Sequence, residues 1–181
     1  MKRKPLVTST RTVARTRLFH VEQVELTFSN GCDVSYERLR SSSGGAVLVV
    51  PVLDPATVLL IREYGAGVER YELAFPKGHV EDDENVLEAA NREMREETGY
   101  GSRRLTRLKS MTLSPGYMNH VTHIVLAQDI YPDRLPGDEP EEIEVVPWPM
   151  ADIAGLLKLE ECTEARSIAA LYMVREMLLG K

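Results

Sequence analysis

The segment GHVEDDENVLEAANREMREETGY, residues 78–100, constrains this chain more than any other, because it specifies a loop, a helix and the charge of one helix face. From residue 85 the apolar residues recur at the spacing of one helical face, and Gly99 is a typical helix end. Glu93, Glu96 and Glu97 stand at positions i, i+3 and i+4 and project from nearly one side. We therefore expect a helix that packs on one face and carries clustered carboxylates on another.

The carboxylate cluster has two interpretations, a solvated acidic face and a metal site. Like charges at this spacing destabilise an isolated helix by roughly a few tenths of a kcal/mol per pair, so a face selected for stability alone would seldom collect them. Mg²⁺ prefers oxygen ligands, and Mn²⁺ suits the same donors. The sequence before and after the helix is needed to distinguish a solvated acidic face from a metal site.

Length and charge limit the remaining possibilities. The chain has 181 residues and a net charge of −6, which suits one domain with a small appendage and disfavours binding to a nucleic-acid backbone. The longest apolar run, residues 46–53, is too short to span a bilayer, and the N-terminus lacks the apolar region of a secretory signal. The two cysteines form no disulfide framework. We expect a cytoplasmic protein without a membrane or nucleic-acid partner.

The pattern of the chain changes near residue 43. Residues 18–40 alternate apolar and polar on both sides of Asn30-Gly31, which is typical of a β-hairpin, and SSSGG at 41–45 indicates a linker. Strand patterns mixed with few helices then favour an α+β fold with a mixed sheet over a doubly wound parallel sheet. We predict an N-terminal antiparallel β unit at 1–43 and a second domain at 44–181. The expected helices of that domain are the acidic one and two near the end, at 152–159 and 164–179.

Counted from Gly78, the acidic segment reads G-x5-E-x7-R-E-U-x-E-E-x-G-U, where U is a bulky apolar residue, without a gap or substitution. This pattern resembles the Nudix box, the signature of the Nudix hydrolases. The resemblance implies an α/β/α sandwich in which the loop–helix–loop binds a divalent metal. It also implies hydrolysis of a nucleoside diphosphate linked to another moiety.

The resemblance assigns roles to the residues of the box. It implies that Glu93 and Glu97 are the main metal ligands, that Glu96 beside them is catalytic, and that Lys77 offers a backbone carbonyl to a metal. Arg92 would orient a glutamate of the box. A pyrophosphate is strongly negative, so a carboxylate site can bind it only through metal ions, which also polarise P–O bonds and activate water. The implied cofactor is Mg²⁺, with Mn²⁺ as the other possibility.

Residues outside the box resemble the ADP-ribose pyrophosphatase branch of the family. Pro115 lies sixteen residues after the last glycine of the box, a spacing that marks this branch. Two departures are a PKG triplet where PAG is usual, and Gly65 where many relatives carry an arginine. Arg62, Glu72 and Pro115 are the candidates for substrate binding, although an ion pair between Arg62 and Glu72 is an equal alternative.

The acidic loop at 137–142 resembles the mobile loop that carries the catalytic base in this branch. By its position, Glu139 is the candidate base and Glu141 the candidate for an additional metal ligand, while Glu142 and Glu144 stay open as alternatives. A solvated charged loop is the competing interpretation. A base on a loop makes physical sense because closure over the substrate can assemble the site and exclude water.

Nearly the whole chain resembles a subgroup that hydrolyses several ADP compounds. This implies cleavage of ADP-ribose to AMP and ribose 5-phosphate, with diadenosine polyphosphates and NADH as further substrates. It also implies a homodimer that exchanges the N-terminal β unit. Two alternatives are an RNA 5′-end pyrophosphohydrolase, which the net charge disfavours, and a non-catalytic ADP-ribose-binding module, which an intact box disfavours. The sequence does not rank the ADP compounds.

Overall fold

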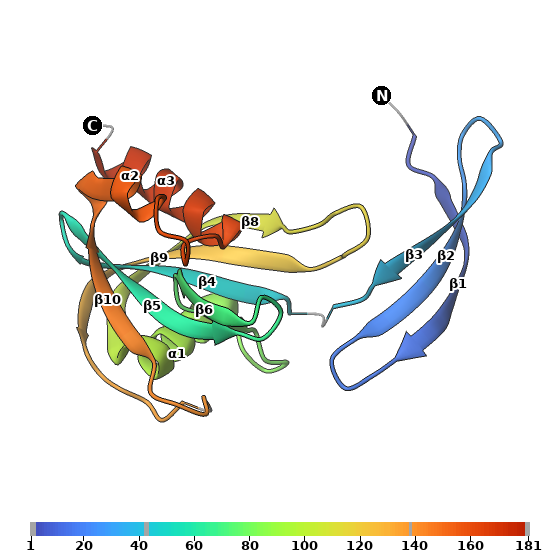
Figure 1. The fold of residues 1–181 in the computed structure, drawn as a ribbon. Coiled ribbons are helices and arrows are strands. Elements are labelled where there is room, and N and C mark those ends of the chain that lie inside the picture. Colours follow the sequence, from blue (N-terminus) through green and yellow to red (C-terminus); the bar gives the residue numbers. More distant parts are fainter. Residues whose placement is uncertain (1–2, 42–43, 138, 180–181) are drawn as a thin grey trace. The chain divides into compact units, whose positions relative to one another are not determined.

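The computed structural model describes residues 3–41, 44–137 and 139–179, and the chain divides into two compact units (Figure 1). The first unit comprises residues 1–45 with the segment 112–121, and the second comprises 46–111 with 122–181. The segment 112–121 was grouped by sequence pattern with the second domain, but its contacts lie with the N-terminal strands. Ser42 and Ser43 of the predicted linker lie outside the described residues.

The first unit is an antiparallel sheet of β1 (Leu6–Arg15), β2 (His20–Thr27) and β3 (Asp33–Leu39), in that order. The predicted hairpin joins β2 to β3, and Gly31 at its turn has a φ of 82°, a value that glycine adopts at little cost. The segment before this hairpin forms β1, which adds a third strand to the antiparallel unit. The segment 112–121 attaches to β3, because the Leu39 amide donates to the Tyr117 carbonyl at 2.7 Å.

The second unit is built on a mixed sheet. Its strands are β4 (Ala46–Asp54), β5 (Thr57–Gly65), β6 (Arg70–Ala74), β7 (Lys77–His79), β8 (Tyr100–Thr112), β9 (Val121–Pro132) and β10 (Glu144–Pro149). The central order is β10-β5-β4-β9-β8, with β6 beside β5 and β7 beside β4. Strands β4 and β9 run parallel, whereas β4 and β10 both pair antiparallel with β5. The predicted mixed sheet is therefore confirmed.

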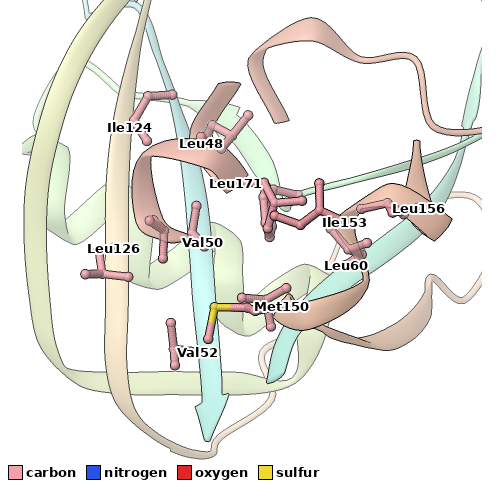
Figure 2. Close-up of a cluster of buried hydrophobic side chains, with 14 of the residues drawn as sticks. Leu48, Val50, Val52, Leu60, Ile124, Leu126, Met150, Ile153, Leu156 and Leu171 are labelled. Carbon is pink, nitrogen blue, oxygen red and sulfur yellow. The ribbon is translucent and has the colours of Figure 1, made fainter. Parts of the chain in front are cut away.

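Helices cover both faces of this sheet (Figure 1). Leu48 and Val50 of β4 pack with α2 (Ile153–Leu156) and α3 (Ala165–Leu179), as Figure 2 shows for Leu48, Val50, Ile153 and Leu171. Val47 and Val49 point the other way and pack with α1 (Val86–Thr98). A strand buried on both faces reads as a continuous apolar run, which explains residues 46–53. The result is the expected three-layer α+β sandwich.

Helix α1 begins and ends where the sequence predicts. The Asn85 side chain accepts hydrogen bonds from the amides of Leu87 and Glu88, and the Glu88 carboxylate accepts one from the Asn85 amide, which completes a capping box. Gly99 ends the helix with a φ of 77°, and its amide donates to the Arg95 carbonyl. Ala90 and Met94 face the core, so the opposite side of the helix keeps a fixed orientation.

The predicted helix at 152–159 is shorter in the structure. A single 3-10 turn at Met150–Asp152 leads into the four-residue α2, and the Asp152 side chain caps that helix at Gly155. Tight turns through Leu159 and Cys162 then replace the last predicted helical residues. Among the residues that the structure describes, no helix is long and apolar enough to cross a membrane.

Candidate active site

An open pocket of about 670 Å³ lies against the charged side of α1. Of the predicted site residues, it brings together Lys77, Arg92, Glu93, Glu96, Glu97 and Glu139. The other lining residues are Glu63, Gly78, His79, Glu81, Pro136 and Gly137. Strand β7 supplies Lys77, Gly78 and His79, so the pocket is framed by the short strand that enters the box and by the helix that follows it.

Glu97 is the most enclosed carboxylate of the pocket, with 5% of the residue exposed. It accepts a hydrogen bond from the Lys77 amide at 2.9 Å. Burial raises the pKa of Glu97 to about 8; the positive charge of Lys77 opposes this rise, while the charges of Glu63 and Glu93 add to it. A carboxylate in this environment gains most when a cation arrives.

Glu93 packs against the backbone of Gly78. A Cβ atom on residue 78 would lie 2.0 Å from the Glu93 carboxyl carbon, so the carboxylate would have to move away from its position. Burial raises the pKa of Glu93, although the neighbouring Arg92 guanidinium works against this rise. The first glycine of the box is therefore needed for space at this position, since the carboxylate occupies the volume of a side chain.

Arg92 connects the loop and the helix of the box. Its Nη1 donates to Glu93 Oε1 at 2.9 Å and to Glu96 Oε2 at 3.0 Å. Its Nε donates to Glu84 Oε1 at 3.0 Å, and its Nη2 donates to the His79 carbonyl at 3.0 Å. The hydrogen bond with Glu84 is the main cause of the raised Arg92 pKa. One guanidinium thus sets the direction of two box glutamates and ties both to the preceding loop.

The donors of this pocket fit a divalent cation. Glu63, Glu93, Glu96 and Glu97 offer carboxylate oxygens, and the backbone of Lys77 offers a carbonyl, which are the ligands that hard cations prefer. In the described part of the chain, no three acidic, histidine or cysteine side chains already stand as a ligand set. Arg92 engages Glu93 through Oε1, and the Lys77 amide engages Glu97 through Oε2, so each carboxylate has a second oxygen with which it could contact a cation.

Arg62 and Glu72, predicted to bind substrate, are engaged elsewhere. Arg62 forms ion pairs with Glu144 and with Glu161, the latter at 2.8 Å. Glu72 accepts a hydrogen bond from the Thr163 hydroxyl at 2.8 Å and pairs with Arg70. The alternative ion pair between Arg62 and Glu72 is not the arrangement found, and neither residue lines the carboxylate pocket.

The acidic loop divides its glutamates between two places. Glu139 lines the carboxylate pocket and also an adjoining shallow cleft. Glu141 lines only the cleft side and accepts a hydrogen bond from the Tyr71 hydroxyl at 2.6 Å, which raises the Tyr71 pKa. Pro115 belongs to the first unit, where it lines a separate groove of about 410 Å³ together with Phe28, Tyr36 and Tyr117.

Sequence reasoning missed Glu63. Its carboxylate accepts a hydrogen bond from Lys77 Nζ at 2.6 Å, although the two residues are fourteen positions apart and lie on different strands. Their meeting depends on how β5 and β7 both associate with β4. The spacing of the box residues does not indicate which strands pair with β4. Glu63 could have been predicted only from the order of the strands in the sheet.

A family model described as the NUDIX domain matches residues 43–171, which is most of the chain. The chain belongs to the Nudix family. A second model, the NudE-type Nudix hydrolase N-terminal domain, matches residues 5–38. The resemblance seen in the box is thereby confirmed, and the protein is a Nudix pyrophosphatase.

Relatives of known activity align along almost the whole length. The ADP compounds hydrolase NudE of Escherichia coli (strain K12) is 48% identical over 178 residues, covering 98% of this chain and 95% of the relative. The ADP-ribose pyrophosphatase of Bacillus subtilis (strain 168) is 29% identical over 174 residues, covering 91% and 92%. A crystal structure of an ADP compounds hydrolase matches with a TM-score of 0.92 and 48% identity, over 99% of this chain and 97% of that one.

Proposed function

We propose that this Nudix enzyme hydrolyses the pyrophosphate bond of ADP-linked compounds. ADP-ribose would give AMP and ribose 5-phosphate, and diadenosine polyphosphates and NADH would be further substrates. The proposal rests on one observation above all, the gathering of Glu93, Glu96 and Glu97 with Arg92 in a single open pocket. The names of the relatives, which are hydrolases of ADP compounds and of ADP-ribose, support the ADP moiety.

The carboxylates would hold Mg²⁺, or Mn²⁺ in its place, through Glu93, Glu97 and the Lys77 carbonyl. When bound, such ions neutralise a pyrophosphate, polarise its P–O bonds and lower the pKa of a bound water. Arg92 keeps Glu93 and Glu96 turned toward the pocket. Without a cation the same carboxylates would repel the substrate, since like charges about 4 Å apart repel by roughly 1 kcal/mol even in water.

Glu139 is our candidate for the base that accepts a proton from the attacking water. It lines the pocket together with Gly137 of the same segment, where a Cβ atom would lie 3.9 Å from Glu96 of the box helix. Glu141 would have to leave the Tyr71 hydroxyl to serve as an additional metal ligand. Both roles fit a loop that adjusts when substrate binds.

The substitution Glu97→Gln tests the proposed site. It keeps the shape of the side chain and removes the charge, so turnover of ADP compounds with Mg²⁺ should fall at least about 100-fold. The assay separates AMP and ribose 5-phosphate by chromatography for ADP-ribose, diadenosine triphosphate and NADH. The matched control is Glu160→Gln, which removes the same charge from an exposed turn and should retain activity.

Two results would contradict the proposal in different ways. Full activity in the Glu97→Gln variant would remove the metal assignment and leave the reaction class intact. Failure of the folded, metal-loaded wild-type enzyme to cleave any ADP compound would remove the substrate class. The remaining hypotheses would then be an ADP-ribose-binding module and an RNA 5′-end substrate.

We also propose that the protein is a homodimer in which the N-terminal β unit crosses to the partner chain. Within its own unit large apolar side chains stay exposed, including Leu6 of β1 at 67% and Leu18 of the turn between β1 and β2 at 71%. So thin a sheet seldom holds a fold without further apolar burial. The apolar groove beside Phe28 and Tyr36 offers more of the same surface.

A further inference from the structure

The carboxylate pocket contains an uneven set of charges. Its described acidic lining residues are Glu63, Glu81, Glu93, Glu96, Glu97 and Glu139. The basic side chains that line it are Arg92 and Lys77. Arg92 is already shared among Glu84, Glu93 and Glu96. Lys77 is therefore the lining cation that can balance the carboxylates on the β7 side.

Lys77 contacts two of these carboxylates through different groups. Its Nζ lies 2.6 Å from Glu63 Oε2, in an ion pair whose side chains are 25% and 29% exposed. Its amide donates to Glu97 Oε2. The Lys77 charge also lowers the pKa of Glu97, whereas the Glu63 charge raises it. The ammonium therefore acts on both carboxylates, on the paired Glu63 directly and on the buried Glu97 through its field.

We propose that the Lys77 ammonium is a resident cation of the pocket, which competes with the divalent metal for Glu63 and Glu97 and so sets the affinity for that metal. The inference rests on the metal site of the proposed function and adds Glu63 and the side chain of Lys77 to it. A fixed positive charge beside a metal site repels the arriving ion and occupies an oxygen donor. When the ammonium is absent, Glu63 becomes available as a further oxygen ligand.

Removing the charge of Glu63 should weaken metal binding, whereas removing the charge of Lys77 should strengthen it. Glu63→Gln removes the partner of Lys77 and leaves its ammonium free to pair with Glu97. The metal then meets one carboxylate fewer and one unpaired cation more. Lys77 and Glu63 thus affect metal binding in opposite directions, a pattern that loss of packing alone does not produce.

The test is a titration of the metal-stripped full chain with Mn²⁺, in which electron paramagnetic resonance measures free Mn²⁺. Lys77→Met should lower the Mn²⁺ concentration at half-saturation roughly five- to tenfold, and Glu63→Gln should raise it by a similar factor. Lys158→Met removes the same charge from an exposed turn and should stay close to wild type. In the double variant, Lys77→Met with Glu63→Gln, the gain should disappear because the freed ligand is gone.

Thermal unfolding provides a second measurement that needs no activity. In EDTA, Lys77→Met should melt below Lys158→Met, because Glu63 and Glu97 have lost their counter-charge. Saturating Mn²⁺ should reverse that order, since a ligand that binds the folded state stabilises it in proportion to its affinity.

Equal Mn²⁺ affinity in Lys77→Met and Lys158→Met would overturn the inference, as would tighter binding in Glu63→Gln. Neither result would contradict the proposed hydrolysis, because the titration measures metal binding without any ADP compound. Failure of the wild-type chain to bind Mn²⁺ would instead overturn the metal site itself, and the role of Lys77 with it.

Discussion

At the scale of residues, the site depends on close contacts between backbone and carboxylates. The Glu93 carboxylate lies where a side chain of residue 78 would be, and the Lys77 amide donates a hydrogen bond to Glu97. Both contacts join β7 to α1, which come one after the other in the chain. The geometry of the proposed metal ligands is thus set by a strand and by a helix that is capped at Asn85 and Gly99.

Gly78→Ala should damage the site more than its size suggests. The added methyl group would displace the Glu93 carboxylate, which is the end of a flexible side chain, so we expect a loss of only about 1 kcal/mol or less in unfolding free energy but a metal affinity at least about tenfold weaker. Urea unfolding and Mn²⁺ titration measure the two effects. Gly67→Ala is the control, because a Cβ there meets no heavy atom within 4 Å. Wild-type metal affinity in Gly78→Ala would contradict the contact.

At the scale of elements, strands β2 and β3 share a buried ionic contact. Glu22 is almost fully buried and pairs with Arg38 at 2.9 Å and Arg40 at 3.0 Å. The hydrogen bond from Arg38 lowers the Glu22 pKa below its ordinary value of 4.5; burial opposes this, and Arg40 adds to the lowering. The unfolded chain therefore binds this proton more readily than the folded one. The contact stabilises the sheet above the ordinary pKa and is lost as pH falls through the folded-state value.

Glu22→Gln should accordingly destabilise the N-terminal sheet at pH 7, by about 1 kcal/mol because both arginines are partly exposed. The difference from wild type should shrink below pH 4.5 as the native carboxylate is protonated. Amide hydrogen exchange in β2, compared at pH 7 and pH 3, follows this directly. Glu37→Gln, an exposed change on β3, should have little effect at either pH. A difference that does not depend on pH would contradict the ionic role of Glu22.

At the scale of the whole molecule, local patterns were predictable and long-range contacts were not. The box predicted α1, its end at Gly99 and the contact of Arg92 with a box glutamate, since these partners lie within one short segment. The Asn30-Gly31 turn likewise fixed the β2–β3 hairpin. In contrast, Arg62 meets Glu161 across 99 positions, and that contact follows from the packing of the C-terminal segment against β5, which no local spacing encodes. The roles of Glu139 and Glu141 also depend on a loop outside the box.

The dimer is a prediction at this scale. Light scattering after size exclusion should give the mass of two chains of 20.3 kDa each. Leu6→Asp places a charge on an exposed apolar position of β1, so it should leave the folded chain intact and shift the protein toward monomer. Ser9→Asp on the same strand is the control. A wild-type protein that is monomeric at micromolar concentration would contradict the exchange of the N-terminal unit.

The alternation of β4 between two cores has an evolutionary consequence. Val47 and Val49 support the layer that carries α1, whereas Leu48 and Val50 support the layer of α2 and α3. Mutations at neighbouring codons will therefore be filtered by different pressures. Positions 47 and 49 will be selected through their contacts with α1, the helix of the proposed active site, and positions 48 and 50 through the stability of the fold. Amino-acid substitutions in β4 should then vary with a period of two residues. Activity would be selected at one set of positions and the stability of the fold at the other.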